Sequence, residues 1–170
     1  TAYQQTAEYH DPGPGNSGDD PGARYALWPD AEALAYIRQN IDGSPVFLEA
    51  VTDQYRWTPR VAQYTGNPVV VGWQWHQSQQ RGAGGAQPAA VNRRIADVRT
   101  MYRTTDVAQF TSLLAKYEVE YVYLGSTERL YFPGEGIAKF DVMVGTVLEV
   151  IFTNGEATVY RVLPTDGESG

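Results

Sequence analysis

The chain has 170 residues, enough to build one domain around a substantial hydrophobic core. A formal charge of −7 and a pI near 4.7 argue against binding to nucleic-acid phosphates or to an anionic membrane surface. The sequence contains no cysteine, which excludes disulfides and thiolate metal sites, and it has no zinc-binding, phosphate-binding or nucleophile-elbow motif. We therefore expect no metal, no cofactor and no nucleic-acid partner.

The ends of the chain carry little sign of regular structure. No apolar run is long enough to span a bilayer, no signal peptide is present, and the chain starts at Thr1 rather than at a methionine, which predicts a piece of a longer protein. Residues 1–28 scatter aromatic side chains around a stretch rich in glycine, proline and aspartate, so we expect an irregular N-terminal segment. Residues 29–164 are predicted to form a single α/β domain and residues 165–170 a disordered tail.

The domain is predicted to begin with a helix and to continue with two short strands. Asp30 is expected to cap this helix, whose apolar residues recur at helical spacing. Val46–Ala50 is largely apolar, as expected for a strand buried on both faces of a sheet. A short helix around 60–64 then leads to a second, β-branched strand, Val69–Val71.

The second half is predicted to add helices, a third strand and a hairpin. Asp106 and Gln109 have the spacing of a capping box at the start of a helix. Asn154-Gly155 between two apolar runs is typical of a β-hairpin turn. The elements expected here are helices over about 91–102, 107–117 and 137–143, a strand at Tyr121–Leu124, and hairpin strands at 147–152 and 157–162.

This order of elements predicts a three-layer α/β fold with a mainly parallel sheet, Rossmann-like or flavodoxin-like connections and a C-terminal antiparallel β-hairpin. We expect Val46–Ala50 in the centre of the sheet, with Val69–Val71 and Tyr121–Leu124 parallel to it. The hairpin is expected to lie antiparallel at one edge.

Polar side chains follow each predicted parallel strand, and the second strand is followed by two tryptophans, a histidine and four amides. Parallel strands end at the same edge of a sheet, so these groups should converge there. Aromatic rings cover the C–H faces of a polyhydroxylated ligand while amides pair with its hydroxyls, which favours a glycan site. The candidate ligand-binding residues are Glu49, Asp53, Arg60, Trp73, Gln74, Trp75, His76, Glu128 and Arg129.

Two other interpretations of these residues stay open. In a structural one, the tryptophans close the end of the core while Glu49 and Glu128 form ion pairs that hold loops together. The arginines available for such pairs are Arg56, Arg60, Arg81 and Arg129. In a catalytic one, His76 acts as a general base oriented by Glu49 or Asp53, or the two glutamates form an acid/base pair.

Several blocks of the sequence are distinctive: GSPVFLEA, RVAQYTGNPVVVGWQWHQSQQR, NRRIADVRTMYRTTD, YEVEYVYLGSTER and GIAKFD. Together, over about 24–162, they resemble the C-terminal region of the "YYY" multispanning membrane proteins of bacteria and archaea. The membrane portion of that family is similar to GT-C glycosyltransferases, which use lipid-linked sugars at the extracytoplasmic face. The resemblance implies an extracytoplasmic soluble domain that follows the last membrane helix. GT-C enzymes keep their catalytic acids on loops of the membrane portion, so the resemblance implies no catalytic residue in this chain.

The first hypothesis is therefore a non-catalytic accessory domain of a membrane glycosyltransferase-like protein, with its own transmembrane portion as partner and a glycan or lipid-linked sugar as ligand. A second is a purely structural domain that packs on the membrane portion or on another protein. A third is an independent hydrolase that uses His76 and a carboxylate.

Overall fold

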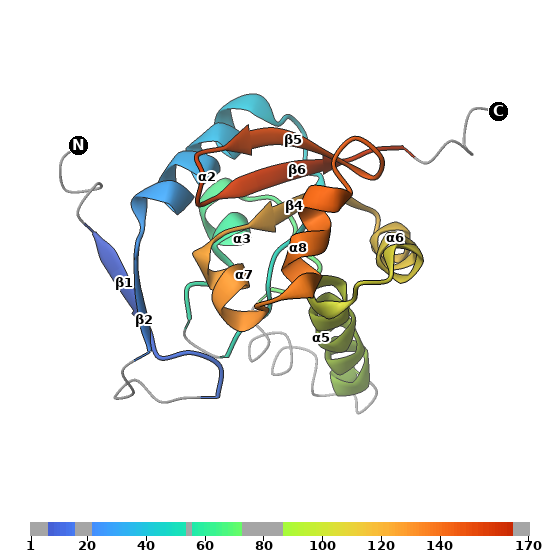
Figure 1. Ribbon diagram of the computed structural model, residues 1–170, viewed down its shortest axis with the longest axis horizontal. Coiled ribbons are helices and arrows are strands. Elements are labelled where there is room, and N and C mark those ends of the chain that lie inside the picture. The colour runs from blue at the N-terminus through green and yellow to red at the C-terminus, as the bar shows by residue number, and fades with distance from the viewer. Residues whose placement is uncertain (1–6, 16–21, 54–55, 73–86, 165–170) are drawn as a thin grey trace.

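The computed structural model describes residues 7–15, 22–53, 56–72 and 87–164, which form a mixed α/β domain (Figure 1). Its main sheet has four strands in the order β3-β4-β6-β5. The strands are β3 (Val46–Leu48), β4 (Val119–Leu124), β5 (Leu148–Thr153) and β6 (Thr158–Val162). The pair β3–β4 is parallel, whereas β4–β6 and β5–β6 are antiparallel.

The prediction of a mainly parallel sheet was wrong, because only one of the three ladders is parallel. The predicted strand at Val69–Val71 makes a single parallel bridge, between Phe47 and Val69. Pro68 has no N–H to extend this pairing, and Gly72 follows three residues after Val69. The hairpin strand β6 pairs with the side of β4 that faces away from β3, so no further parallel strand can pair with β4 there. One ladder and one bridge do not establish the predicted Rossmann-like or flavodoxin-like connections.

Two hydrophobic clusters lie on opposite faces of the main sheet, because successive strand residues point to opposite sides. On one face, Phe47 and Tyr123 pack with α2 (Trp28–Asn40) and α3 (Arg60–Thr65). On the other face, the cluster contains Leu48 and Val122. The helices that cover this second face are α5 (Gln87–Arg103), α6 (Val107–Lys116) and α8 (Glu135–Val142).

The predicted C-terminal hairpin is confirmed as the antiparallel pair β5–β6. Its turn is the predicted Asn-Gly pair, in which Gly155 adopts the left-handed φ of +92° that suits a residue without Cβ. The Asn154 side chain stabilises the turn by accepting a hydrogen bond from the Ala157 N–H over 2.9 Å. The same side chain donates to the Pro29 carbonyl, which joins the turn to the start of α2.

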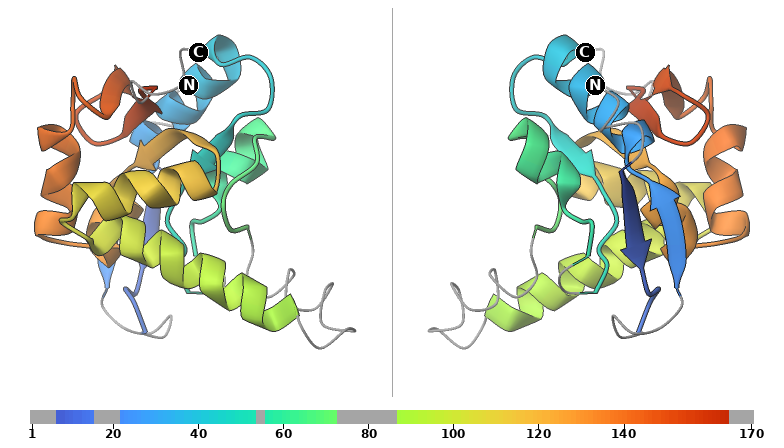
Figure 2. Two further views of the ribbon diagram at one scale, coloured as in Figure 1. Left: turned by 90° about the vertical axis from the view of Figure 1, so that its right-hand side faces the viewer. Right: turned by 90° about the vertical axis from the view of Figure 1, so that its left-hand side faces the viewer.

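The N-terminal segment is not irregular over its described residues, since β1 (Glu8–Asp11) and β2 (Ala23–Ala26) pair antiparallel. Tyr9 and Tyr25 face each other in this pairing, with ring centroids 5.6 Å apart. The stretch rich in glycine, proline and aspartate lies between the two strands in the sequence. The right-hand view of Figure 2 shows this two-stranded sheet beside the main domain. It contacts α7 (Ser126–Tyr131), a helix that the sequence did not predict, through a 2.6 Å hydrogen bond between the hydroxyls of Tyr25 and Thr127.

Most helices lie close to their predicted positions. The Asp106 side chain caps α6 as expected, accepting a hydrogen bond from the Gln109 N–H over 3.1 Å. The predicted cap of α2 was wrong, because this helix begins at Trp28 and Asp30 lies inside its first turn, buried. In the described part of the chain, no helix combines the length and the apolarity needed to cross a membrane. The predicted tail at 165–170 lies outside the described residues.

Candidate functional site

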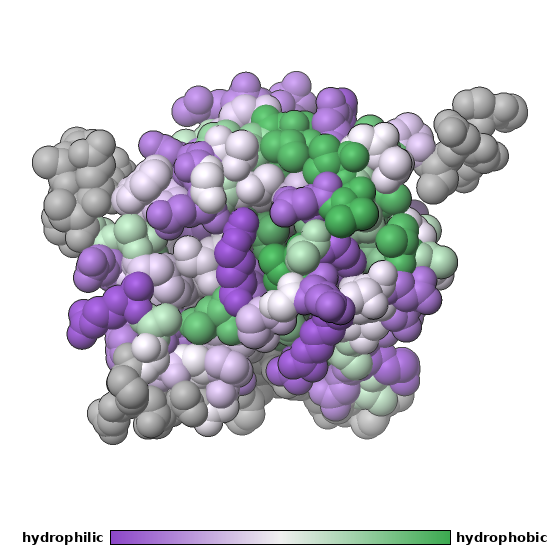
Figure 3. Space-filling model, in the orientation of Figure 1, coloured by the Kyte–Doolittle hydropathy of each residue, from purple (hydrophilic) through white to green (hydrophobic). Residues whose placement is uncertain are grey.

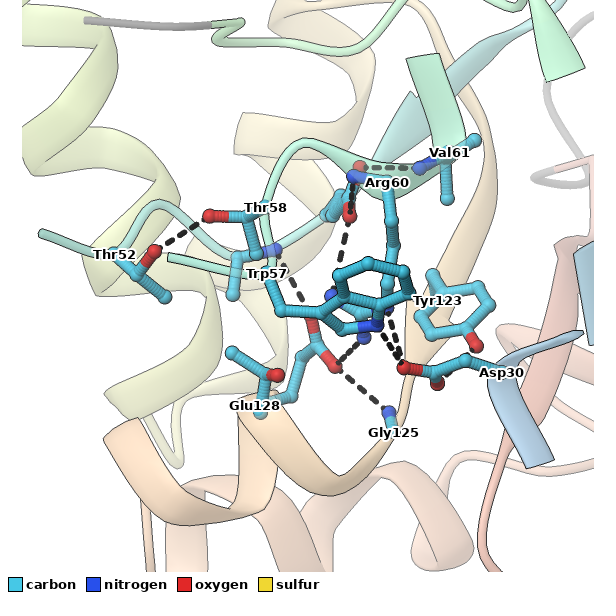
Figure 4. A network of polar contacts seen from close by, with 12 residues as sticks. Asp30, Thr52, Trp57, Thr58, Arg60, Val61, Tyr123, Gly125 and Glu128 are labelled. Carbon is cyan, nitrogen blue, oxygen red and sulfur yellow. Dashed lines mark hydrogen bonds and ion pairs between the residues drawn. The ribbon is translucent and has the colours of Figure 1, made fainter. Parts of the chain in front are cut away.

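The most unusual feature of the domain is a fully buried arginine, Arg60, that contacts three carboxylates (Figure 4). Its Nη1 donates to Glu49 Oε1 over 3.2 Å, and its Nη2 donates to Glu128 Oε2 over 2.5 Å. Its Nε lies 3.1 Å from Asp30 Oδ2. Because a buried guanidinium is stable only when carboxylates balance its charge and accept its hydrogen bonds, these four residues act as one unit, the Arg60 cluster.

The topology of the sheet explains how the cluster is assembled. Glu49 comes directly after β3, and Glu128 lies in the first turn of α7, just after β4. Because β3 and β4 are parallel, both carboxylates lie at the same edge of the sheet. Arg60 is the first residue of α3, and Asp30 comes from the first turn of α2. Four elements that are distant in sequence therefore meet at one point.

Each glutamate also binds backbone N–H groups. Glu49 accepts from the N–H groups of Arg60 and Val61, over 2.7 and 3.0 Å, so it satisfies two donors at the start of α3. Glu128 accepts from the N–H of Ala50 over 3.3 Å and from that of Gly125 over 2.8 Å. The two carboxylates thus connect the chain after β3 to the starts of α3 and α7.

Sequence reasoning did not identify the aromatic part of this site. Tyr123 donates its hydroxyl hydrogen to Asp30 Oδ1 over 2.6 Å, and the guanidinium carbon of Arg60 lies 4.5 Å from the centroid of its ring. The Trp57 indole N–H donates to Asp30 Oδ2 over 2.6 Å. The available signals were ambiguous, because Asp30 has the sequence context of a helix cap and Tyr123 resembles an ordinary strand residue.

Burial and charge act in opposite directions on the members of the cluster. Burial lowers the pKa of Arg60, but the carboxylates of Asp30 and Glu128 raise it more, so this pKa lies well above its ordinary value and the guanidinium stays charged. Burial raises the pKa of Glu49 to about 8; the charge of Arg60 lowers it, and the nearby Glu128 raises it again. One guanidinium faces three carboxylates, so protonation of Glu49 reduces the excess of buried negative charge.

The structure brings together only some of the predicted site residues. Glu49, Arg60 and Glu128 meet in the Arg60 cluster, as the ion-pair interpretation expects. Asp53 Oδ2 instead accepts a hydrogen bond from the Gly15 N–H over 2.6 Å. Arg129 is exposed, and its Nη1 donates to the Gly125 carbonyl over 3.3 Å. The other four, Trp73, Gln74, Trp75 and His76, lie outside the described residues.

This arrangement suits scaffolding better than acid/base chemistry. Both oxygens of Glu49 and both oxygens of Glu128 accept hydrogen bonds from the backbone or from Arg60. The side chain of Arg60 is 0% exposed and occupies the space between them. Across the described ranges, no group of three or more histidine, aspartate or glutamate side chains is placed to hold a metal ion.

Comparison with solved structures shows a similarity of fold. No protein-family model matches the chain, and no curated protein matches it. The crystal structure of the C-terminal globular domain of an oligosaccharyltransferase from Archaeoglobus fulgidus is similar, with a TM-score of 0.49 and 10% sequence identity. The similarity covers 80% of this chain and 96% of that domain, and at this identity it concerns the fold alone.

Proposed function

We propose that the chain is a non-catalytic, extracytoplasmic accessory domain of a membrane glycosyltransferase-like protein. The resemblance of its sequence blocks to the YYY family supports this proposal. The observation that carries it is the Arg60 cluster, because two of the carboxylates that a hydrolase would need, Glu49 and Glu128, are buried and bonded to Arg60 and the backbone. The domain then contributes binding energy for a substrate whose reaction takes place in the membrane portion.

In this proposal the glycan contacts are made by the polar segment after Val71, in which Trp73 and Trp75 stack on sugar rings. Gln74 and His76 then donate and accept hydrogen bonds. The Arg60 cluster supports this role indirectly, since it holds the adjoining elements rigid and a binding surface costs less entropy when its scaffold is preorganised. The ligand is a glycan or a lipid-linked sugar.

The test is to titrate the chain with a panel of oligosaccharides by calorimetry and to incubate it with aryl glycosides while following product release. We expect binding without turnover, and a loss of binding in Trp75→Ala. Tyr36→Ala is the matched aromatic control, because Tyr36 packs on Phe152 with ring centroids 5.0 Å apart and belongs to α2. Turnover that His76→Ala abolishes would overturn the proposal in favour of a hydrolase.

A second candidate, packing on the protein's own transmembrane portion or on a partner, is favoured by exposed valines near one edge of the main sheet. Val142, Val144 and Val150 are 79, 43 and 39% exposed. Figure 3 shows apolar surface over β5 and the end of α8 on this face. Exposed apolar patches are typical of docking surfaces.

This second function predicts that the chain co-purifies with its separately expressed transmembrane portion. The double variant Val142→Asp/Val144→Asp should abolish that association. The control is Val107→Asp on α6, where Val107 is 41% exposed. Association that survives the double variant would remove this candidate.

A further inference from the structure

A groove of about 350 Å³ lies beside the N-terminal sheet, between α2 and the segment that leads into α3. Two aromatic side chains, Trp57 and Tyr64, line one part of it, and residues of α2 line another. The right-hand view of Figure 2 shows β1, β2, α2 and α3 together on this side of the molecule. None of the residues that line the groove is among the ligand-binding residues predicted from the sequence.

The aromatic part of the groove is held in place by contacts of Trp57 with residues that do not line the groove. The rings of Trp57 and Tyr64 lie 5.6 Å apart between centroids and are tilted by 43°, so they form a bent wall. Tyr9 packs on Trp57 at 5.9 Å, and the Trp57 indole N–H is bonded to the buried Asp30. Tyr64 is 50% exposed, although a tyrosine ring gains free energy when it is covered. The wall is therefore preorganised and accessible.

The helical part of the groove combines small side chains with a positive charge. Ala31, Leu34, Ala35 and Arg38 of α2 all line it, at the three- and four-residue spacings that place residues on one face of a helix. The alanines leave room above the helix, whereas Leu34 is buried beneath. Arg38 is exposed, and within the described ranges it has no ion-pair partner.

We propose that this groove binds one sugar ring that carries a negatively charged group, a carboxylate or a phosphate. The apolar face of the ring stacks on Trp57 and Tyr64, and the anionic group binds the guanidinium of Arg38. The volume lies at the small end of the range for ligand pockets, roughly 300–1,000 Å³, which suits a single ring better than a long lipid tail. This inference rests on the proposed function and adds a second sugar-binding site with a defined charge preference.

Because the chain has a negative net charge, the expected preference for an anionic sugar depends on Arg38 alone among the groove residues. With a formal charge of −7, the protein as a whole repels anions, so an acidic sugar has to be held by a local cation. Arg38 donates in a planar fork that matches both carboxylate and phosphate oxygens. Binding of the charged ligand should therefore weaken as the salt concentration rises, whereas binding of a neutral sugar should not.

The test follows the indole N–H signal of Trp57 by ¹⁵N-labelled NMR, assigned among the four tryptophans with the variant Trp57→Phe. The probes are methyl β-glucuronide, glucose 1-phosphate and the neutral methyl β-glucoside. We expect a charged probe to shift the signal at lower concentration than the neutral one. If methyl β-glucuronide binds more tightly than glucose 1-phosphate, the site prefers a carboxylate, and the reverse order shows a preference for a phosphate.

Variants at the exposed positions test the geometry without disturbing the core. Tyr64→Ala should weaken binding of the charged probe about tenfold, and Arg38→Gln should reduce its affinity to that of the neutral probe. The matched controls, Tyr36→Ala and Arg93→Gln, should leave both affinities unchanged. A Trp57 signal that no probe shifts, or a shift that Tyr64→Ala and Arg38→Gln leave unchanged, would overturn the inference.

The outcome also separates this inference from the function on which it rests. Glycan binding that depends on Trp75 but not on Tyr64 or Arg38 would refute the groove alone. Turnover of aryl glycosides that depends on His76 would refute the proposed function, and the groove variants would not alter it.

Discussion

Arg60 and Glu128 are 68 positions apart in the sequence, yet Nη2 of the arginine lies 2.5 Å from Oε2 of the glutamate, and both side chains are 0% exposed. This contact joins the start of α3 to the first turn of α7. Since Glu128 also accepts from the Ala50 N–H, the segment after β3 is connected to the same point. The pair thus fixes the relative positions of the connections that leave the two parallel strands.

Replacing Arg60 with methionine should destabilise the domain strongly. Methionine is similar to the unbranched apolar stem of arginine but lacks the guanidinium. The substitution therefore leaves two glutamates and Asp30 buried without a cation. Removal of one partner from a buried ion pair costs about 3–5 kcal/mol of unfolding free energy. Urea denaturation at neutral pH measures this change. Arg129→Met is the control, because Arg129 is exposed and should change the unfolding free energy by less than about 1 kcal/mol. Equal effects of the two variants would contradict the central role of Arg60.

Glu49 should make stability depend on pH in the direction opposite to that of an ordinary ion-paired acid. Burial raises its pKa in the folded state to about 8, from an ordinary value of 4.5, so the folded protein holds a proton that the unfolded chain releases. The stabilisation is fully present below pH 4.5 and is lost as the pH rises to 8, with a slope of up to about 1.4 kcal/mol per pH unit. Urea midpoints measured from pH 5 to 8 should therefore fall.

The variant Glu49→Gln should remove this slope, because a glutamine cannot titrate. It keeps one oxygen that can accept from the Arg60 N–H at the start of α3, so the domain should still fold. Glu149→Gln on the outer strand β5 serves as the control, since Glu149 is exposed beside Arg161. A slope that persists in Glu49→Gln would show that another group binds the proton.

Lys139 should make the stability of the domain rise with pH in the alkaline range, opposite to the effect of Glu49. Its ammonium is buried and donates to the carbonyls of Met101 and Gly136 over 2.6 and 2.7 Å. Burial lowers its pKa to about 8, from an ordinary value of 10.5, so the unfolded chain binds a proton that the folded protein loses. Stability should then rise from pH 8 to 10.5, and together with Glu49 this gives a minimum near pH 8.

The variant Lys139→Met should abolish the rise above pH 8 in the urea midpoint, whereas Lys116→Met should preserve it. Lys116 is exposed and forms an ion pair with Asp97, so it lacks the burial that lowers the pKa of Lys139. A rise of the same size in Lys139→Met would assign it to a different group.

Local sequence patterns predicted the elements that depend on local chemistry. The Asn-Gly turn between β5 and β6 and the Asp106 cap of α6 were both found, because each depends on residues a few positions apart. The approach of Glu49 to Glu128 also followed from sequence reasoning, through the rule that parallel strands end at one edge.

Features decided by tertiary contacts could not be predicted in this way. Asp30 has the sequence context of a helix cap, but its carboxylate binds Tyr123 and Trp57 and lies beside Arg60, which no local pattern shows. The apolar run at Val69–Val71 indicates burial but not pairing, and only Val69 is bridged to a strand. The sequence therefore predicted that charged groups converge, and it included Arg60 among four arginines that could pair with the glutamates, but it did not single out Arg60 or place Asp30 beside it.

A single methyl group added at Gly125 should disturb the Arg60 cluster, because Gly125 lies directly against it. A Cβ there would lie 2.8 Å from Asp30 Oδ1, 3.0 Å from Arg60 Nη2 and 3.1 Å from Tyr123 Cε1. Its φ of −128° suits any residue, so the expected cost comes from crowding rather than from backbone strain. Because Asp30 is held by Tyr123 and Trp57, it cannot move away freely, and Gly125→Ala should lower the unfolding free energy by about 1–3 kcal/mol.

A double-mutant cycle identifies the source of this cost. In an Asp30→Ala background the nearest atom is gone, so Gly125→Ala should cost at least about 1 kcal/mol less than in the native chain. Gly66→Ala provides the contrast: a Cβ at Gly66 meets nothing within 4 Å, but its φ of +81° imposes backbone strain. The cost of Gly66→Ala should therefore be the same with and without Asp30. If the costs of Gly125→Ala and Asp30→Ala simply add, Gly125 does not act through the Arg60 cluster.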